Sequence, residues 1–298
     1  MRADRFSTSQ FPSRWVSRAL RTGVLMVALL PLGACDTVQS LNPFDKAEVY
    51  KPEVKETIPA EQLYNEGLAF VDKKEYEGAA KRFNELDKQY PFSTWSQRAL
   101  VMQTFANFEA RNYDEAIATG KRYLGLHPAS QDAAYVAYLV ANSYYNQIPD
   151  TSRDQERSEK ALLSFQEVVQ RWPNSEYATD AKFKINVVKD QLAGREMQVG
   201  RYYLKKNNFP AAINRFRIVV AQFQTTNQIE EALARLTEAY LALGVIGEAE
   251  TAAAVLGHNF PDSPWYKDAY QLLQSRGLSP RESGDSWITK AFKSVGLG

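Results

Sequence analysis

The sequence predicts an all-α protein, a solenoid of about five stacked helix pairs, and three observations support this prediction. Similar stretches recur along the chain, and the prolines that end the first two, Pro91 and Pro128, lie 37 residues apart. Repeats of this length are typical of helical arrays, and proline cannot continue a helix. The composition is 44% hydrophobic and 12% aromatic, which supplies a core. A near balance of 36 basic and 35 acidic residues argues against a nucleic-acid-binding domain.

The first 35 residues have the composition of a bacterial lipoprotein signal. Five arginines precede an uncharged run at 23–32, which is too short to span a bilayer. The motif LGAC, which ends at Cys35, resembles the lipobox, in which the cysteine is diacylated and the chain is cut just before it. We therefore predict a signal peptide over 1–34, with a diacylglycerol and an N-acyl chain on Cys35 as a stable lipid anchor.

An ordinary signal peptide with a chance cysteine and a signal anchor are the alternatives for this segment. Because Cys35 is the only cysteine, disulfides within the chain are impossible and zinc sites of the cysteine–histidine type are nearly excluded. Asp36 resembles an inner-membrane retention signal of enterobacteria, so it leaves the choice of membrane open. Pro43, Pro52 and polar residues follow without helical periodicity, and we interpret 35–58 as the acylated N-terminus and an extended tether.

The periodic region that follows resembles the tetratricopeptide repeat, which places small and large apolar residues at fixed steps along two helices. Gly67 and Phe83 take the small and the aromatic positions in the first repeat, and Gly200 and Phe216 take them in the fourth. The small residue lets the two helices approach closely, and the ring fills the gap beside it. An irregular helical bundle is the alternative. The predicted boundaries are 59–175 for repeats one to three and 176–275 for repeats four and five.

The second and third repeats depart from this pattern. Thr104 stands at the glycine position of the second repeat. In the third, the insertion IPDTSRDQE separates helices expected at about 132–147 and 157–171, and such insertions usually emerge as loops. A further helix at about 176–192 either stands alone or runs on into the fourth repeat. Serines after the helix-ending prolines are expected to cap the next helix. These serines are Ser93, Ser130, Ser175 and Ser263.

In arrays of this kind the first-helix positions between the packing residues line a groove that binds extended peptides or helices. In repeats one and two these positions form an apolar, aromatic surface with one cation, Arg98. We expect it to bind an unfolded segment with aromatic side chains, with Arg98 available for a carboxylate. Packing of the same side chains against the tether or neighbouring helices is the alternative. The predicted groove residues are Tyr64, Leu68, Val71, Arg98, Val101, Phe105 and Phe108.

The sequence offers little catalytic chemistry. It contains no HExxH motif, no glycine-rich phosphate loop and no GxSxG motif. The two histidines, His127 and His258, lie near the ends of predicted second helices, where we expect capping or surface roles. We therefore predict a protein that is not an enzyme, with no catalytic residue, no metal site and no cofactor beyond the acyl chains on Cys35.

Three stretches are too specific for a generic repeat: YPFSTWS at 90–96, residues 171–203 around NSEYATDA, and AAINRF at 211–216. Together they resemble the BamD family of the outer-membrane β-barrel assembly machinery. The resemblance covers roughly 59–265 and the lipobox. It implies a lipoprotein anchored in the outer membrane, facing the periplasm, that scaffolds the POTRA domains of the barrel-forming subunit and contacts small accessory lipoproteins.

The resemblance also implies that the first repeats receive the C-terminal signal of unfolded outer-membrane proteins, which ends in an aromatic residue. In the Asn214-Arg215 pair, it implies that Arg215 binds an acidic POTRA residue; an ordinary solvent-facing arginine is the alternative. The alternative function is a lipid-anchored scaffold for cell division, pilus or secretin assembly, or peptidoglycan coordination. The tail at 276–298 lies beyond the resemblance. Its end is weakly amphipathic, with Trp287, Ile288 and Phe292, so a short partner-binding helix is the alternative, but we predict that the tail is flexible.

Overall fold

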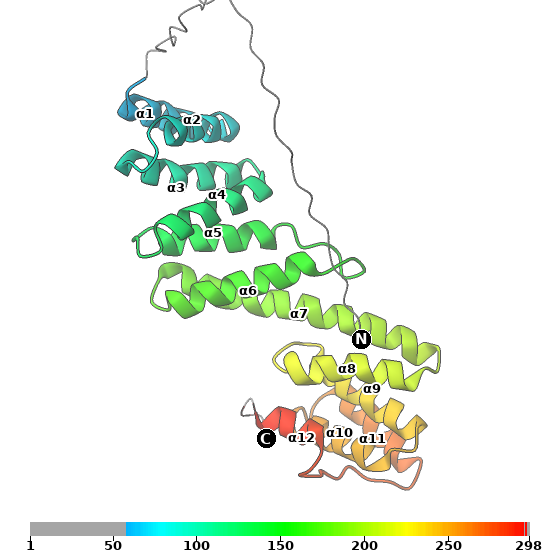
Figure 1. Cartoon of the computed structure of the whole chain (residues 1–298). Helices are drawn as coiled ribbons and strands as arrows, with labels where there is room; N and C mark the ends of the chain where they lie inside the picture. The colour runs from blue at the N-terminus through cyan, green and yellow to red at the C-terminus, as the bar shows by residue number, and fades with distance from the viewer. Residues whose placement is uncertain (1–57, 295, 297–298) are drawn as a thin grey trace, which may run out of the picture. The chain divides into compact units, whose positions relative to one another are not determined.

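The computed structural model describes residues 58–294 and residue 296, and within them the fold is all-α, as predicted. Twelve helices and no strand occur in this part of the chain (Figure 1). The predicted signal peptide, Cys35 and all of the tether before Ile58 lie outside the described residues. The helices are α1 (Ala60–Asp72), α2 (Tyr76–Gln89), α3 (Thr94–Glu109), α4 (Tyr113–Leu126), α5 (Ala133–Tyr145), α6 (Glu156–Arg171), α7 (Glu176–Lys205), α8 (Phe209–Gln222), α9 (Ile229–Ala242), α10 (Ile246–Asn259), α11 (Pro264–Gln274) and α12 (Trp287–Lys293).

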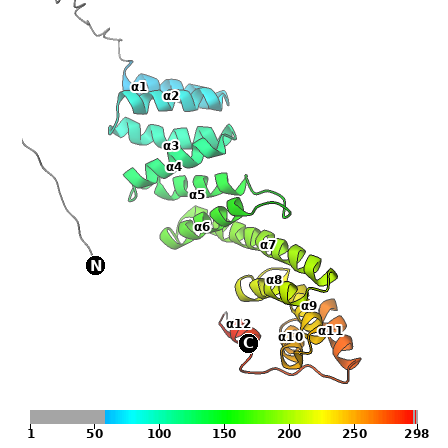
Figure 2. The ribbon, with the colours of Figure 1, turned by 45° about the vertical axis from the view of Figure 1, so that its right-hand side comes forward.

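From α1 to α10 each helix packs mainly on its neighbours along the chain, so that helix pairs stack in order (Figures 1 and 2). The first helices of the pairs also contact one another: α1 packs on α3, α3 on α5 and α5 on α7. No such close packing joins α2 with α4 or α4 with α6. The first helices therefore form the inner side of the solenoid, which we call the first-helix face.

The turns inside four of the five helix pairs share one backbone geometry, and the exception is the α5–α6 pair, which carries the insertion. In each, one residue adopts a positive φ, and the N–H of the residue after it donates to the carbonyl oxygen five positions earlier at 2.9 Å. Non-glycine residues rarely adopt this left-handed conformation, so its recurrence identifies copies of one structural unit. The four residues are Lys74 (φ 60°), Arg111 (61°), Asn207 (56°) and Gly244 (75°).

The predicted small-to-aromatic packing is confirmed. A Cβ atom on Gly67 would lie 2.5 Å from the ring of Phe83, and one on Gly200 would lie 2.4 Å from the ring of Phe216. Gly120 of α4 allows a close approach between two pairs, because a Cβ atom there would lie 2.4 Å from Val140 of α5. Glycine is required at these positions because there is no room for a Cβ atom, and a larger side chain would separate the packed helices.

The additional helix after the third pair is continuous with the first helix of the fourth, and together they form the 30-residue α7. Its first half packs against α6, and its second half packs against α8 (Figures 1 and 2). The start of α6 and the end of α8 meet near Leu192, at the middle of α7. One helix therefore belongs to both halves of the array.

The predicted serine caps are confirmed in two places. Ser93 and Ser263 accept a backbone N–H at the start of α3 and α11. The prediction is wrong for Ser130, since α5 begins three residues later with Asp132 at its N-cap position. Ser175 does precede α7, but its hydroxyl donates to a carbonyl of the preceding turn instead of accepting from the helix.

The prediction of a flexible C-terminal tail is wrong for α12. This helix packs between α8 and α10, and Ile288 and Phe292 are completely buried there. The Trp287 Nε1–H donates to the Tyr240 hydroxyl at 3.1 Å, and the Arg217 guanidinium lies 4.7 Å from the Trp287 ring. The α12 helix therefore covers the second helices of the last two pairs, whereas α11 packs on α9 and α10 at the end of the array. None of the described helices is long and apolar enough to cross a membrane.

Candidate interaction surfaces

The first candidate surface lies on α1 and α3, where Tyr64 and Arg98 meet Trp95. The Tyr64 ring lies 5.6 Å from that of Phe83 in the core and 5.5 Å from that of Trp95. The guanidinium of the exposed Arg98 lies 5.6 Å from the Trp95 ring, and it forms no ion pair with another described residue. An aromatic cluster beside an available cation can hold an aromatic side chain and a carboxylate together.

Three other predicted groove residues are held more firmly in the packing. Leu68 and Val71 are half-buried against the core around Phe83. Val101 retains 9% of its exposure and belongs to a buried cluster with Val136 of α5. The prediction is therefore wrong for Val101, because the neighbouring first helix covers it.

The two predicted phenylalanines of α3 lie against tyrosines of the second helices. Phe105 packs edge-on against Tyr76 at 6.1 Å, and Phe108 packs at 5.9 Å against Tyr113. Both rings are half-buried. They present part of their surface, but they also hold α3 against α2 and α4, so removing them would disturb the fold as well as the groove.

The sequence prediction missed three tyrosines that continue this face. Tyr177 of α7 stacks on Tyr138 at 5.2 Å and lies 5.5 Å from Tyr135. Burial raises the pKa of Tyr135 and that of Tyr177 to about 12. The charge of Glu109 near Tyr135 and Glu176 next to Tyr177 act in the same direction. The sequence contains a signal for two of these tyrosines. When the groove positions of repeats one and two are moved on by one repeat, they fall on Tyr135 and Tyr138.

A lysine fixes the position of these rings. The Lys184 ammonium lies 5.1 Å from the Tyr138 ring and 5.4 Å from the Tyr145 ring, and pairs with Asp180 at 3.1 Å. Burial would raise the pKa of Asp180, but hydrogen bonds from Tyr138 and Lys184 outweigh this and lower it. The aromatic part of the first-helix face is therefore preorganised.

The second candidate surface is on α8, where Asn214 and Arg215 were predicted to bind a partner. Asn214 is exposed. Arg215 pairs with Glu196 of α7 at 3.2 Å, with 42% of the arginine side chain and 20% of the glutamate side chain exposed. Arg215 is therefore accessible, but it already has a carboxylate partner within the chain.

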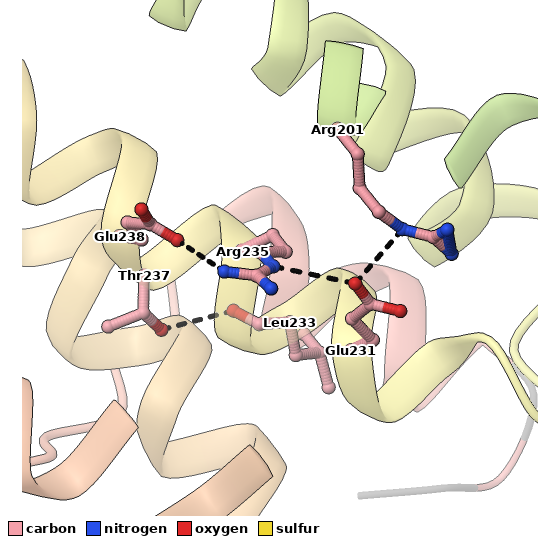
Figure 3. Close-up of polar contacts among 6 residues, drawn as sticks. All are labelled: Arg201, Glu231, Leu233, Arg235, Thr237 and Glu238. Carbon is pink, nitrogen blue, oxygen red and sulfur yellow. Dashed lines mark hydrogen bonds and ion pairs between the residues drawn. The ribbon is translucent and has the colours of Figure 1, made fainter. Parts of the chain in front are cut away.

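The first-helix face of the later repeats carries ion pairs instead of rings (Figure 3). Glu231 of α9, 14% exposed, accepts from Arg201 of α7 at 3.0 Å and from Arg235 at 3.4 Å. Arg235 also pairs with Glu238 at 2.9 Å, and its guanidinium lies 5.1 Å from the Trp265 ring. These contacts join the second half of α7 to α9 and α11.

The histidines take the roles predicted for them. His127 is the C-cap residue of α4 and packs against the Tyr123 ring at 5.2 Å, and His258 is exposed in the last turn of α10. Across residues 58–294, no group of three or more His, Cys, Asp or Glu side chains is placed to hold a metal ion.

The fold defines a class of protein, an array of tetratricopeptide-like helix pairs. The family model described as "YfiO: Outer membrane lipoprotein" matches residues 56–256. The chain belongs to this family, whose curated members are named BamD. The match ends within α10, so α11 and α12 lie beyond it.

Three relatives are each named outer membrane protein assembly factor BamD. The protein of Caulobacter vibrioides is 47% identical over 227 residues, covering 76% of this chain and 74% of the relative. The protein of Rickettsia prowazekii is 41% identical, covering 84% and 95%. That of Neisseria meningitidis serogroup A is 32% identical, covering 83% and 94%. These names describe assembly factors and not enzymes, in agreement with the prediction, and they associate the family with the outer membrane.

Proposed function

We propose that this chain is the lipid-anchored scaffold subunit of the outer-membrane β-barrel assembly complex. In this role it holds the periplasmic POTRA domains of the barrel-forming subunit, contacts small accessory lipoproteins, and receives C-terminal signals of unfolded outer-membrane proteins. The observation that carries the proposal is the family match over residues 56–256. No comparable observation favours a role in cell division, pilus or secretin assembly, or peptidoglycan coordination.

Affinity purification of the full chain from detergent-solubilised membranes tests this assignment. The proposal expects recovery of a barrel protein with POTRA domains, identified by mass spectrometry. Recovery of division, pilus or peptidoglycan-binding proteins in its place would contradict it.

The membrane anchor in this proposal is Cys35, which carries a diacylglycerol and an N-acyl chain and faces the periplasm through the tether. A Cys35→Ala variant should lose the acyl mass from its N-terminal peptide and leave the outer-membrane fraction on a density gradient. An unchanged distribution would contradict the lipid anchor. The same gradient, applied to an Asp36→Ser variant, tests whether Asp36 affects sorting.

For substrate signals, we propose that the terminal aromatic ring packs by Tyr64 and Trp95 while the carboxylate pairs with Arg98. Arg98→Glu should weaken binding of a C-terminal peptide by about tenfold or more, because a charge-assisted hydrogen bond is replaced by repulsion. Amidation of the peptide should remove the difference between Arg98→Glu and the parent protein. Arg153→Glu, on the exposed insertion loop, is the matched control.

For the POTRA contact, we propose that Arg215 pairs with a carboxylate of the partner. Arg215→Glu should abolish co-purification of the barrel subunit, since charge reversal in a close pair has a large effect. The double variant Arg215→Glu/Glu196→Arg restores an ion pair inside the chain. Recovery of binding in this double variant would assign Arg215 an internal role only and contradict the proposed contact.

A further inference from the structure

The turn between α9 and α10 exposes three aliphatic side chains, which we call the aliphatic tip. Leu243 is 44% exposed, Val245 is 41% exposed and Ile246 is 36% exposed. A Cβ atom added to Gly244 or Gly247 would meet no described atom within 4 Å, so nothing in this part of the chain packs against these two positions. Neighbouring aliphatic side chains with this much free surface are typical of a contact with another molecule or a membrane.

The aliphatic tip is specific to the fifth pair, because the corresponding turns of the first and second pairs are polar. The residue with a positive φ is followed by Glu75 in the first pair, by Asn112 in the second and by Val245 in the fifth. All three take the N-cap position of a second helix, and none of their side chains caps that helix with a hydrogen bond. The turn therefore does not require an aliphatic residue here, and packing within the chain does not explain the tip.

Cations and a tyrosine accompany the aliphatic tip. At the corresponding turn of the preceding pair, α7 ends in Lys205 and Lys206 follows, without an acidic residue on either side. Tyr202, one helical turn earlier, is 59% exposed, and the Lys206 ammonium lies 6.0 Å from its ring. Beside the tip, the exposed Arg276 donates to the carbonyl oxygen of Leu241 at 3.1 Å. None of these three cations forms an ion pair with another described residue.

A lipid surface fits these turns better than a protein partner. Protein interfaces depend mainly on aromatic residues and arginines in well-packed pockets, and leucine and valine are under-represented among their main contributors. A bilayer requires no complementary pocket. Aliphatic side chains enter the boundary of the acyl chains, tyrosines are enriched at the level of the headgroups, and basic side chains are attracted to anionic lipids.

A bilayer is also within reach of the array if Cys35 is acylated. Residues 36–57 separate Cys35 from Ile58, and a chain of this length spans at most about 75 Å, at roughly 3.4 Å for each residue. The anchor thus keeps the array close to one membrane, where the effective concentration of lipid is high and a weak contact is enough.

We propose that the α7–α8 and α9–α10 turns contact the membrane that holds the anchor, with the aliphatic tip at the boundary between headgroups and acyl chains. Lys205, Lys206 and Arg276 pair with lipid phosphate groups. The Tyr202 hydroxyl lies among the headgroups. This inference rests on the lipid anchor of the proposed function and adds a second, weaker membrane contact, which orients the array relative to the bilayer.

The test uses the full acylated chain, in which lipid occupies the Cys35 thiol, with an environment-sensitive fluorophore attached through a Val245→Cys substitution. The chain is reconstituted in vesicles of equal parts phosphatidylcholine and phosphatidylglycerol with a nitroxide on the acyl chains. Emission should shift to the blue, and quenching should exceed that at a control position by about twofold or more. Glu75→Cys is the matched control, because Glu75 is exposed and takes the same place in the first pair.

A second variant tests the cations. Lys205→Gln/Lys206→Gln, made in the labelled chain, should lower the population in contact with lipid by about tenfold or more, because each lysine is attracted to the anionic surface. The effect should shrink at high salt and in vesicles of phosphatidylcholine alone. Lys73→Gln/Lys74→Gln removes two exposed lysines from the corresponding turn of the first pair and should leave the signal unchanged. Circular dichroism is expected to show the fold intact in all variants, since every substituted residue is exposed.

Each outcome is decisive. No change at position 245 on reconstitution, an equal change at position 75, or no effect of Lys205→Gln/Lys206→Gln overturns the membrane contact. A change at position 245 that requires the purified barrel-forming subunit would make a protein the occupant, and one that accompanies self-association in sedimentation would make it a second copy; both overturn the inference. If the parent chain does not float with the vesicles, the proposed anchor fails and the inference with it. If the chain floats and position 245 stays unchanged, only this inference fails.

Discussion

The two halves of the array share a helix-pair architecture but differ in the chemistry of the first-helix face. The position directly after the small packing residue shows this most clearly. It holds Leu68 and Phe105 in the first two pairs, and Arg201 and Glu238 in the last two. At this position the early pairs therefore present an aliphatic side chain and a ring, whereas the later pairs present charges that already have partners.

The helix-pair fold therefore fixes the position of each side chain on this face, while the type of side chain at that position can differ between pairs. The rings of the first half keep part of their surface exposed, which agrees with the proposed binding of flexible segments. The paired charges of the second half stabilise the chain that carries them. Four substitutions or titrations test this contrast, in order of decreasing effect.

The largest loss of stability is expected for a substitution at Gly200, because α7 belongs to both halves of the array. Gly200→Val should lower the free energy of unfolding by about 3 kcal/mol or more, because the new side chain overlaps the Phe216 ring. Gly67→Val makes a similar overlap with Phe83 but in the terminal pair. Hydrogen exchange should show loss of protection across α7 and α8 in the first variant and only across α1 and α2 in the second. Equal loss everywhere would show that the halves are not separate.

The next effect concerns α12, which belongs to the second half alone. Phe292→Ala should lower the free energy of unfolding by about 2 kcal/mol, below the usual range for a buried ring because a terminal helix can detach. Trp287 fluorescence should shift to the red as the ring leaves Arg217 and Tyr240. Lys290→Ala, at an exposed position of α12, is the control. If α12 were flexible, the two variants would have the same free energy of unfolding and the same Trp287 fluorescence.

A smaller effect is expected in the ion-pair network. Glu231→Gln leaves Arg201 and Arg235 without their shared carboxylate, and should cost about 1–2 kcal/mol of stability. Glu238→Gln should cost less, because Glu238 pairs with Arg235 alone and is 43% exposed. Chemical denaturation of both variants checks the order. A larger loss of stability with Glu238→Gln than with Glu231→Gln would mean that the network does not join α7 to α9.

The smallest effect appears only at high pH and in the first half. Tyr135 and Tyr177 have pKa values of about 12 in the folded chain against 10.0 ordinarily, so folding favours their protonated forms. Their contribution is fully present below pH 10 and is lost as the pH rises from about 10 to about 12. Tyr135→Phe/Tyr177→Phe should flatten this part of the stability curve. Absorbance titration with parallel thermal melts measures it, and an unchanged curve would contradict the assignment.

The fold was predictable because its signals are local and repeated. A glycine facing a ring, and the proline that follows four of the five second helices, act within one pair, so a single chain displays them several times. The α12 helix carried no such signal: its segment is short, and Ile288 and Phe292 are buried only by contacts with α8 and α10.

The sequence predicted where the candidate site residues lie, but not the contacts that their side chains make. Repeat mapping placed Tyr64 and Arg98 on the correct face, and extending it would have found Tyr135. It could not show that Val101 is buried in a cluster with Val136, nor that Glu196 pairs with Arg215, because both depend on how neighbouring helices approach.

The continuity of α7 has a geometric consequence. An α-helix turns by about 100° and rises 1.5 Å for every residue. The number of residues between Lys184, which lies by the Tyr138 ring, and Glu196, which pairs with Arg215, therefore fixes the angle about the helix axis between these two side chains. One alanine inserted between them would turn the residues after it by about 100° relative to the residues before it. The relative orientation of the aromatic surface and the Arg215 surface therefore depends on the number of residues in α7.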